Sequence, residues 1–209
     1  MLLLFGLTAL SAFSQEDYAE NYTGSIGVSF NNILDKEYGY LGAIGINFGG
    51  YTFFKSKYNV GLLTLTTLNF FVAGRADYDG IFMYDQTLAA AFRHKLGRNI
   101  ELLWAIGPHL SVLNMTYKQN PDEKLSTNRI NVGIAGDIGL KLNSKDTKSY
   151  IIAGINIGYD FFTSGGTARK DGYHEEVTTG HYLVGIKPYI MLGTNARVFS
   201  GLLDDKKDE

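Results

Sequence analysis

The sequence of 209 residues has no cysteine, which excludes disulfides, thiolate metal sites, cysteine nucleophiles and a lipid-modified N-terminal cysteine. It also has no excess of either charge, with 19 Lys and Arg against 21 Asp and Glu. This argues against a nucleic-acid-binding protein, which usually carries a strongly basic face. No segment keeps a period of 3.6 residues, so we expect essentially no helix. With 3 prolines, 25 glycines, 14 tyrosines and 13 phenylalanines, the composition favours an all-β chain.

An apolar stretch opens the chain, MLLLFGLTALSAF, and it is too short to cross a bilayer as a helix, which takes about 20 residues. Small residues at Ala12 and Ser14 are followed by the polar run 15–17, which is typical of the cleavage site of a secretory signal peptide. No Lys or Arg precedes the stretch, although signal peptides usually begin with one. We therefore expect residues 1–14 to be a signal peptide, with a buried N-terminal strand or helix as the alternative.

Eight segments alternate between apolar and polar residues with a period of two, which indicates β-strands. In the sixth segment, for example, Ile130 and Val132 flank Asn131. Each segment is about 10 to 14 residues long, which is twice the usual length of a soluble strand and suits a tilted strand that crosses a membrane. The segments are 22–31, 40–48, 60–73, 82–93, 100–112, 130–142, 151–161 and 182–192.

The connections between these segments alternate in character. One set is compact and carries Lys or Arg: 55–59, 94–99 and 143–149. The other set is read as longer polar loops and includes 74–80, 118–128 and 163–179. Short turns on one rim and longer loops on the other are typical of a bacterial outer-membrane barrel. An even number of strands that starts in the periplasm also ends there, so we expect periplasmic N- and C-termini and extracellular long loops.

The polar face of the segments consists mainly of Gly, Ala, Ser, Thr and Asn, which would coat a water-soluble exterior poorly. Turned inward, these small residues leave room for a few long side chains to fill the interior of an eight-stranded barrel. The apolar face ends in aromatic residues such as Tyr40, Phe48 and Tyr159, as an interfacial girdle requires. We therefore predict an all-β, eight-stranded antiparallel up-and-down transmembrane β-barrel, with a soluble barrel or sandwich as the alternative.

The predicted barrel covers residues 15–199, and a polar periplasmic tail follows at 200–209. Pro108 and Pro188 fit this assignment least, because each lies within a segment and removes a hydrogen-bond donor from the ladder. The chain from Tyr22 to about Phe199 resembles the small eight-stranded outer-membrane barrels, the OmpW, OmpX and OmpA-barrel class. The resemblance is one of architecture, without a family-specific motif.

The resemblance implies a location in the outer membrane, contact with outer-membrane lipid, a monomer and no cofactor. Proteins of this class usually end on an aromatic residue that closes the last strand, and Phe199 is the nearest candidate here. OmpW-like members are linked to the passage of small hydrophobic molecules, as in a porin-like conduit. OmpX-like and OmpA-like members are linked to adhesion and envelope integrity, through host or envelope ligands at the loops.

Five charged residues fall on the predicted inward face. Arg93, Glu101 and Lys141 lie at one rim, with Glu101 expected between the two cations, and Asp137 and Lys187 lie near mid-height. Buried charges must be paired or hydrated, so they indicate either a lumen plugged by ion pairs or a narrow gated pore. For eight strands, whose side chains roughly fill the interior, we favour the plug.

Asp85, Asp160 and the run His109-Leu110-Ser111 are further polar positions on the inward face. His109, Ser111 and Glu123 resemble the His, Ser and Glu of the lipid A deacylase barrels, which hydrolyse an acyl chain with a serine nucleophile and a histidine base. That family has Asn where Val112 stands, and inward side chains are turned away from lipid. We interpret these residues as lumen-lining polar groups and predict no catalytic site.

His174-Glu175-Glu176 and His181 could approach a metal ion, but metal sites demand fixed ligand geometry, and we interpret this stretch as a solvated loop. Our first hypothesis is therefore a barrel with a largely filled lumen that acts through its extracellular loops. A conduit for small or hydrophobic solutes is the second, and a lipid A-modifying enzyme is the third.

Overall fold

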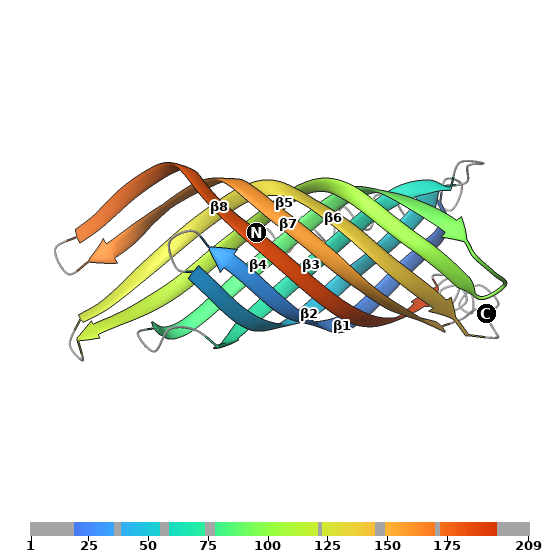
Figure 1. Cartoon of the computed structure of the whole chain (residues 1–209), viewed down its shortest axis with the longest axis horizontal. Helices are drawn as coiled ribbons and strands as arrows, with labels where there is room; N and C mark the ends of the chain where they lie inside the picture. The colour runs from blue at the N-terminus through green and yellow to red at the C-terminus, as the bar shows by residue number, and fades with distance from the viewer. Residues whose placement is uncertain are drawn as a thin grey trace, which may run out of the picture.

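The computed structural model describes the backbone of residues 19–35, 39–54, 59–73, 78–120, 123–144, 149–169 and 172–195. These residues form eight strands, which are drawn in chain order from blue to red in Figure 1. The strands are β1 (Ala19–Asp35), β2 (Gly39–Phe54), β3 (Val60–Ala73), β4 (Tyr78–Lys95), β5 (Ile100–Asn120), β6 (Glu123–Asn143), β7 (Ser149–Arg169) and β8 (Gly172–Asn195). None of the described residues forms a helix that is long and apolar enough to cross a bilayer.

Each strand pairs antiparallel with the next along the chain, and β8 pairs with β1, so the sheet closes into a barrel. This confirms the predicted all-β, eight-stranded up-and-down fold. The turns β2–β3, β4–β5 and β6–β7 lie at one end, which we call the turn rim, and the other four connections lie at the opposite end, which we call the hairpin end (Figure 1). The predicted signal peptide, the tail 200–209 and Phe199 lie outside the described residues.

The alternation of side chains along the strands is also as predicted. On β1, Val28 and Phe30 are exposed, at 51% and 64%, whereas Asn31 is 2% exposed. On β3, Asn69 is buried and Phe70 is exposed. Exposed Ile, Leu, Val or Phe side chains lie on the outside of every strand and form an apolar belt around the barrel. A belt of this extent is unusual on a soluble monomer and is the surface that a bilayer requires.

Two of the predicted loops are in fact extensions of strands. The stretch 118–128 belongs to β5 and β6, which pair as far as Asn120 and Glu123, and 163–179 belongs to β7 and β8, which pair as far as Arg169 and Gly172. The connection 74–80 is shortened as well, because β4 begins at Tyr78. These stretches are largely polar in sequence, so the apolar alternation that marks a membrane strand is missing, yet their backbones continue the ladder. Figure 1 shows the two hairpins reaching beyond the rest of the barrel.

The two mid-strand prolines lie at interruptions of the ladder. Pro108 lies opposite Ile134 of β6, and on its other side the β4–β5 ladder lacks two pairs. Pro188 lies opposite Ile155 of β7, and on its other side the β1–β8 ladder lacks two pairs. The register is the same before and after each gap, so no bulge is needed. Each proline therefore lacks its N–H donor at a position where the ladder makes no hydrogen bond. Both prolines are thus compatible with the predicted barrel.

Candidate functional site in the barrel interior

The buried side chains of the barrel interior form three layers. Near the hairpin end, Ile33, Leu41, Met83 and Leu113 are completely buried. The middle layer is polar. Near the turn rim lies a larger apolar cluster with residues from six strands: Tyr51, Phe53, Leu63, Leu65, Ala89, Ala91, Leu103, Ala105, Tyr150, Ile152, Tyr189 and Met191. The polar layer is thus sandwiched between two apolar layers, and its groups must find partners among themselves.

A chain of four charged or ionisable side chains crosses the polar layer. Nδ1 of His109 on β5 lies 2.7 Å from Oδ1 of Asp160 on β7, and Nε2 lies 3.2 Å from Oδ1 of Asp85 on β4. Nζ of Lys187 on β8 lies 3.1 Å from Oδ2 of Asp85. All four residues are at most 3% exposed. Nδ1 makes a hydrogen bond to Asp160, whereas Nε2 contacts Asp85 without one, and with a doubly protonated imidazole the two carboxylates are balanced by two cations.

Neutral side chains extend this chain around the barrel. The Ser111 hydroxyl donates to Oδ2 of Asp160 over 3.0 Å, and the Asn131 amide donates to the Ser111 oxygen over 2.9 Å. The Thr163 hydroxyl in turn donates to the side-chain oxygen of Asn131 over 2.9 Å. On the other side, Asn69 donates to Asp85 and Asn31 donates to Asn69. The connected network, which we call the His109 network, comprises Asn31, Asn69, Asp85, His109, Ser111, Asn131, Asp160, Thr163 and Lys187, and it joins every strand except β2.

Asp137 lies on the turn-rim side of the His109 network and is 5% exposed. Its Oδ1 accepts hydrogen bonds from the hydroxyls of Tyr51 and, over 2.8 Å, of Tyr189. Its Oδ2 accepts from the Asn156 amide over 3.3 Å. These donors come from β2, β8 and β7, so the carboxylate connects the polar layer with two aromatic residues of the apolar cluster at the turn rim.

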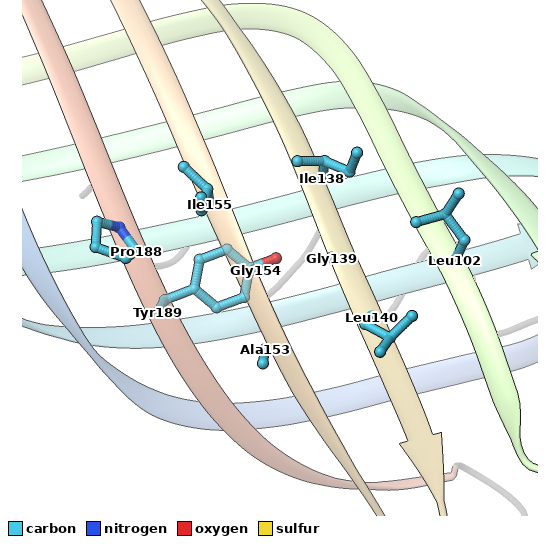
Figure 2. Close-up of a pocket in the computed structure, with 9 residues that line it drawn as sticks. All are labelled: Leu102, Ile138, Gly139, Leu140, Ala153, Gly154, Ile155, Pro188 and Tyr189. Atoms are coloured by element: carbon cyan, nitrogen blue, oxygen red, sulfur yellow. The ribbon is translucent and has the colours of Figure 1, made fainter.

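A glycine makes room for the Tyr189 ring. Figure 2 shows the ring of Tyr189 extending from β8 across the neighbouring strand at Gly154. A Cβ atom at Gly154 would lie 2.6 Å from both Cζ and the hydroxyl oxygen of Tyr189, and 2.7 Å from the carbonyl oxygen of Ile138. Contacts under about 3 Å are not tolerated, so the sequence needs glycine here for close approach rather than for backbone freedom.

We expect Gly154→Ala to lower the free energy of unfolding by about 1–3 kcal/mol, the usual cost of overpacking. The added methyl group displaces the Tyr189 ring and weakens its bond to Asp137. The matched control is Gly97→Ala, because a Cβ atom at Gly97 meets nothing within 4 Å. Urea titration of both variants in lipid vesicles measures the difference, and equal stabilities would contradict this packing.

At the turn rim, Lys141 pairs with Glu101, and the cationic groups of Lys141 and Arg93 each lie over an aromatic ring. Lys141 lies directly opposite Glu101 in the β5–β6 register, and its Nζ is 3.6 Å from Oε2 of Glu101 and 4.6 Å from the Tyr150 ring centroid. Arg93 donates to the Asn59 side chain over 3.1 Å and lies 4.7 Å above the Phe53 ring. These cations therefore contact the aromatic part of the apolar cluster and cover it at this end.

No protein-family model and no curated protein matches the sequence. Among solved structures, the fold is similar to that of a major outer membrane protein from Thermus thermophilus, with a TM-score of 0.57 and 9% sequence identity, over 81% of this chain and 98% of the other. It is also similar to Neisserial surface protein A, with a TM-score of 0.54 and 6% identity, over 81% of this chain and 95% of the other. The chain has the fold of a small eight-stranded outer-membrane β-barrel.

In this outer-membrane barrel fold, His109 and Ser111 do not form a nucleophile–base pair. Both side chains are hydrogen-bonded to Asp160 instead, and the Ser111 hydroxyl donates its hydrogen bond to a carboxylate rather than to the imidazole. Both are buried in the lumen, where a lipid acyl group has no access, and the Glu123 side chain lies outside the described residues. The arrangement therefore supplies charge balance and rigidity rather than a lipid-cleaving centre.

Metal-ligand positions are equally absent from the described part of the barrel, where no group of three His, Cys, Asp or Glu residues is arranged to hold an ion. His109 lies between Asp85 and Asp160 and keeps the two carboxylates apart. The side chains of His174, Glu175, Glu176 and His181 lie outside the described residues.

Several partners of the charged residues were missed at the sequence level. Asn31, Asn69 and Asn131 occupy inward positions in the same alternation that places Asp85, and Tyr51 lies four residues beyond the inward Asn47 on the same face of β2. The signal was therefore present in the period-two pattern. The pattern does not show which inward residues share a height, because that depends on the stagger between strands.

Proposed function

We propose that the protein lies in the bacterial outer membrane, with its turn rim and both termini in the periplasm, and acts through its hairpin end in adhesion or envelope integrity. The main support for this proposal is that some strands extend further than others at the hairpin end. β1 ends at Asp35, which pairs with Leu183, whereas β8 extends beyond that pair to Gly172. The outer parts of β5–β8, residues 115–120, 123–128, 164–169 and 172–182, form a four-stranded sheet that we call the hairpin wall.

The free edge of the hairpin wall supports a binding role. From Gly172 to Thr179, β8 pairs with β7, and no other described strand pairs with this part of β8. An edge strand presents a row of free N–H and C=O groups, to which an extended segment of another protein can add as a further strand. A host or envelope protein is therefore the class of partner that this edge suits.

The packing of buried side chains in the interior supports a barrel that does not conduct. Two apolar layers enclose the His109 network, and the larger one includes bulky aromatic or branched side chains from β2, β3 and β7: Tyr51, Phe53, Leu63, Leu65, Tyr150 and Ile152. We expect the refolded protein to give no steady current in a planar bilayer. Steady open-channel current would instead establish the conduit.

Shortening the β7–β8 hairpin tests the role of the wall. Thr163 and Thr178 are paired in the β7–β8 ladder. Replacing residues 164–177 with Asn-Gly therefore joins them through a two-residue turn and keeps the register of the remaining β7–β8 pairs. We expect attachment of cells that display this variant to host cells or matrix proteins to fall to background. Replacing only Lys170 and Asp171 with Asn-Gly keeps the wall and should keep attachment. Undiminished attachment by the shortened variant, at equal surface expression, would overturn the proposal.

Trypsin tests the orientation, because β7 ends at Arg169 and Lys170 follows it in the connection to β8. We expect trypsin added to intact cells to cut there, since exposed loop tips are preferred cleavage sites. Lys95 and Arg98, at the turn rim, should be cut only after the outer membrane is opened. The reverse pattern would invert the assignment of the two ends.

A further inference from the structure

A polar cluster lies on the outer face of β3 and β4, within the apolar belt. Gln86 of β4 pairs with Thr66 of β3, and both side chains are half-buried and turned outward, because their chain neighbours are buried in the interior. The Thr66 hydroxyl donates to Oε1 of Gln86 over 2.7 Å, and the Tyr84 hydroxyl donates to the same oxygen over 2.9 Å. Thr64 lies on the same outward face, two residues from Thr66. One primary amide and several hydroxyls are therefore gathered on the lipid side of the barrel.

The cluster lies in the middle of the outward face of these two strands. The outward residues of β3 run from Leu62 to Phe70, with Thr66 at the centre. Those of β4 run from Phe82 to Phe92, and Gln86 lies one residue from the centre. At about 3.3 Å per residue, Gln86 is roughly 13 Å and 20 Å along the strand from the two ends of this run. The cluster is therefore far from both ends of the membrane-spanning face.

Aromatic pairs lie at both ends of the same face. Toward the hairpin end, the rings of Phe70 and Phe82 pack edge to face, with 5.7 Å between their centroids. Toward the turn rim, Phe92 stacks on Trp104 of β5, with 4.0 Å between centroids. Aromatic side chains gather at the two interfaces between bilayer and water. The polar cluster between these pairs is thus at the depth of the hydrocarbon.

The Gln86 amide is weakly bonded within its own chain. Its Nε2 lies 3.4 Å from the carbonyl oxygen of Leu65 and 3.3 Å from that of Thr87, beyond the roughly 2.7–3.2 Å that is typical of N–H···O bonds. The hydroxyls of Thr66 and Tyr84 donate to its Oε1, and their own oxygens keep lone pairs that can accept. Acyl chains can bond neither the amide donors nor these acceptors, so the cluster suits a polar partner within the membrane.

A second copy of the same chain supplies such a partner. Barrels inserted into one membrane share their direction, so two copies related by a two-fold axis along the bilayer normal meet at equal depth. An amide carries both donors and an acceptor, so Gln86 can bond to Gln86 of the partner subunit or to Thr66 of the partner subunit. The short Thr64 and Thr66 side chains let the two sheets approach closely. A different membrane protein would need a polar group of its own at this depth, whereas symmetry provides it in a dimer.

We propose that the outer face of β3 and β4 is an interface between two copies of this chain in the membrane, centred on hydrogen bonds between their Gln86 amides. The resemblance to the small outer-membrane barrels implies a monomer, and the polar cluster is the observation that argues against it. β3 and β4 lie across the barrel from β7 and β8, so both copies keep their hairpin walls accessible. The interface requires the membrane location but not the adhesive role.

Disulfide cross-linking tests this interface, because the chain has no cysteine of its own. Thr64→Cys and Leu68→Cys place a thiol on either side of Thr66, and Ile157→Cys places one near the middle of the outward face of β7, where Ile157 is exposed. Two thiols join only when their Cβ atoms come within about 3.5–4.5 Å. Each full-length variant is expressed in a bacterial outer membrane, the isolated membranes are oxidised with copper phenanthroline, and dimers are followed by non-reducing electrophoresis.

We expect the faster of the two β3 variants to form dimers at an initial rate at least about 10-fold above that of Ile157→Cys, because the interface holds its thiols together. Adding Gln86→Leu to that variant should lower the rate at least about 5-fold, since leucine offers no hydrogen bond. Leucine suits the lipid face, so the barrel itself keeps its fold. The matched control, Gln119→Leu, removes a glutamine next to the end of β5 at Asn120 and should leave the rate unchanged.

Equal rates on β3 and β7 would mean random collision and would overturn the proposal. A rate that survives Gln86→Leu would also overturn it, because association would then not depend on the polar cluster. An equal loss with Gln119→Leu would contradict a contact at this depth. Attachment through the hairpin wall is measured separately on cells, so failure of the dimer leaves that proposal standing.

Discussion

Replacing His109 with leucine should lower the free energy of unfolding by about 3–5 kcal/mol, the cost of removing one partner from a buried ionic network. Leucine fills much of the same space but offers no donor. It leaves Oδ1 of Asp160 and Oδ1 of Asp85 without the nitrogens that lie 2.7 and 3.2 Å away. The two carboxylates keep their hydrogen bonds from Ser111 and Asn69, but within the described network Lys187 is then the one cation that balances them, in a layer enclosed by apolar side chains. Urea unfolding in lipid vesicles measures the change.

Two further variants separate loss of charge balance from loss of packing. His94→Leu makes the same substitution at an exposed position on β4 and should change stability by less than about 0.5 kcal/mol. Adding Asp160→Asn to His109→Leu removes one of the orphaned charges and should recover part of the loss, a coupling that a double-mutant cycle measures. A loss below about 1 kcal/mol for His109→Leu, or no recovery in the double variant, would mean that the network is not a closed ionic unit.

The sequence predicts the fold well because the outer face must be apolar at every second position along the whole membrane-spanning length. A slip by one residue would move Ile130, Val132 and Ile134 from lipid into the lumen, so the pattern fixes both the strand and its orientation. The orientation of β3 follows from the same rule, because Thr67 and Asn69 are poorly suited to lipid and turn inward.

The ends of the strands and the partners within the lumen are less predictable. Beyond the bilayer, both faces of a hairpin can meet water, so in β7 and β8 the alternation disappears while the ladder continues to Arg169 and Gly172. Within the lumen, Glu101 was expected between Arg93 and Lys141. Lys141 does lie opposite it, with 3.6 Å between the charged atoms, but the β4–β5 register places Lys95 rather than Arg93 opposite Glu101. His109 and Asp160, on strands separated by β6, meet across the barrel interior, and no local pattern encodes that contact.

The second large effect concerns the outer face of the barrel. We expect Ile134→Arg to lower the free energy of unfolding by about 2–4 kcal/mol in vesicles, the cost of an arginine near the bilayer midplane on the lipid side of a barrel. The exposed apolar residues of β6 run from Ile130 to Leu142, and Ile134 lies two residues from the middle of that run, 45% exposed. Arginine there either places a guanidinium in hydrocarbon or must stretch toward an interface.

Asn128→Arg is the depth control for this substitution. Asn128 is exposed on the same strand, beyond the outer end of the apolar run. The same arginine should cost only about 0–1 kcal/mol at that level, because it reaches the headgroups or water. In a soluble barrel, both positions would face water and both substitutions would be nearly neutral, since surface changes usually stay within about 0.5 kcal/mol. Equal stabilities of the two variants would therefore place the apolar belt in water and remove the membrane assignment on which the proposed function of the hairpin wall depends.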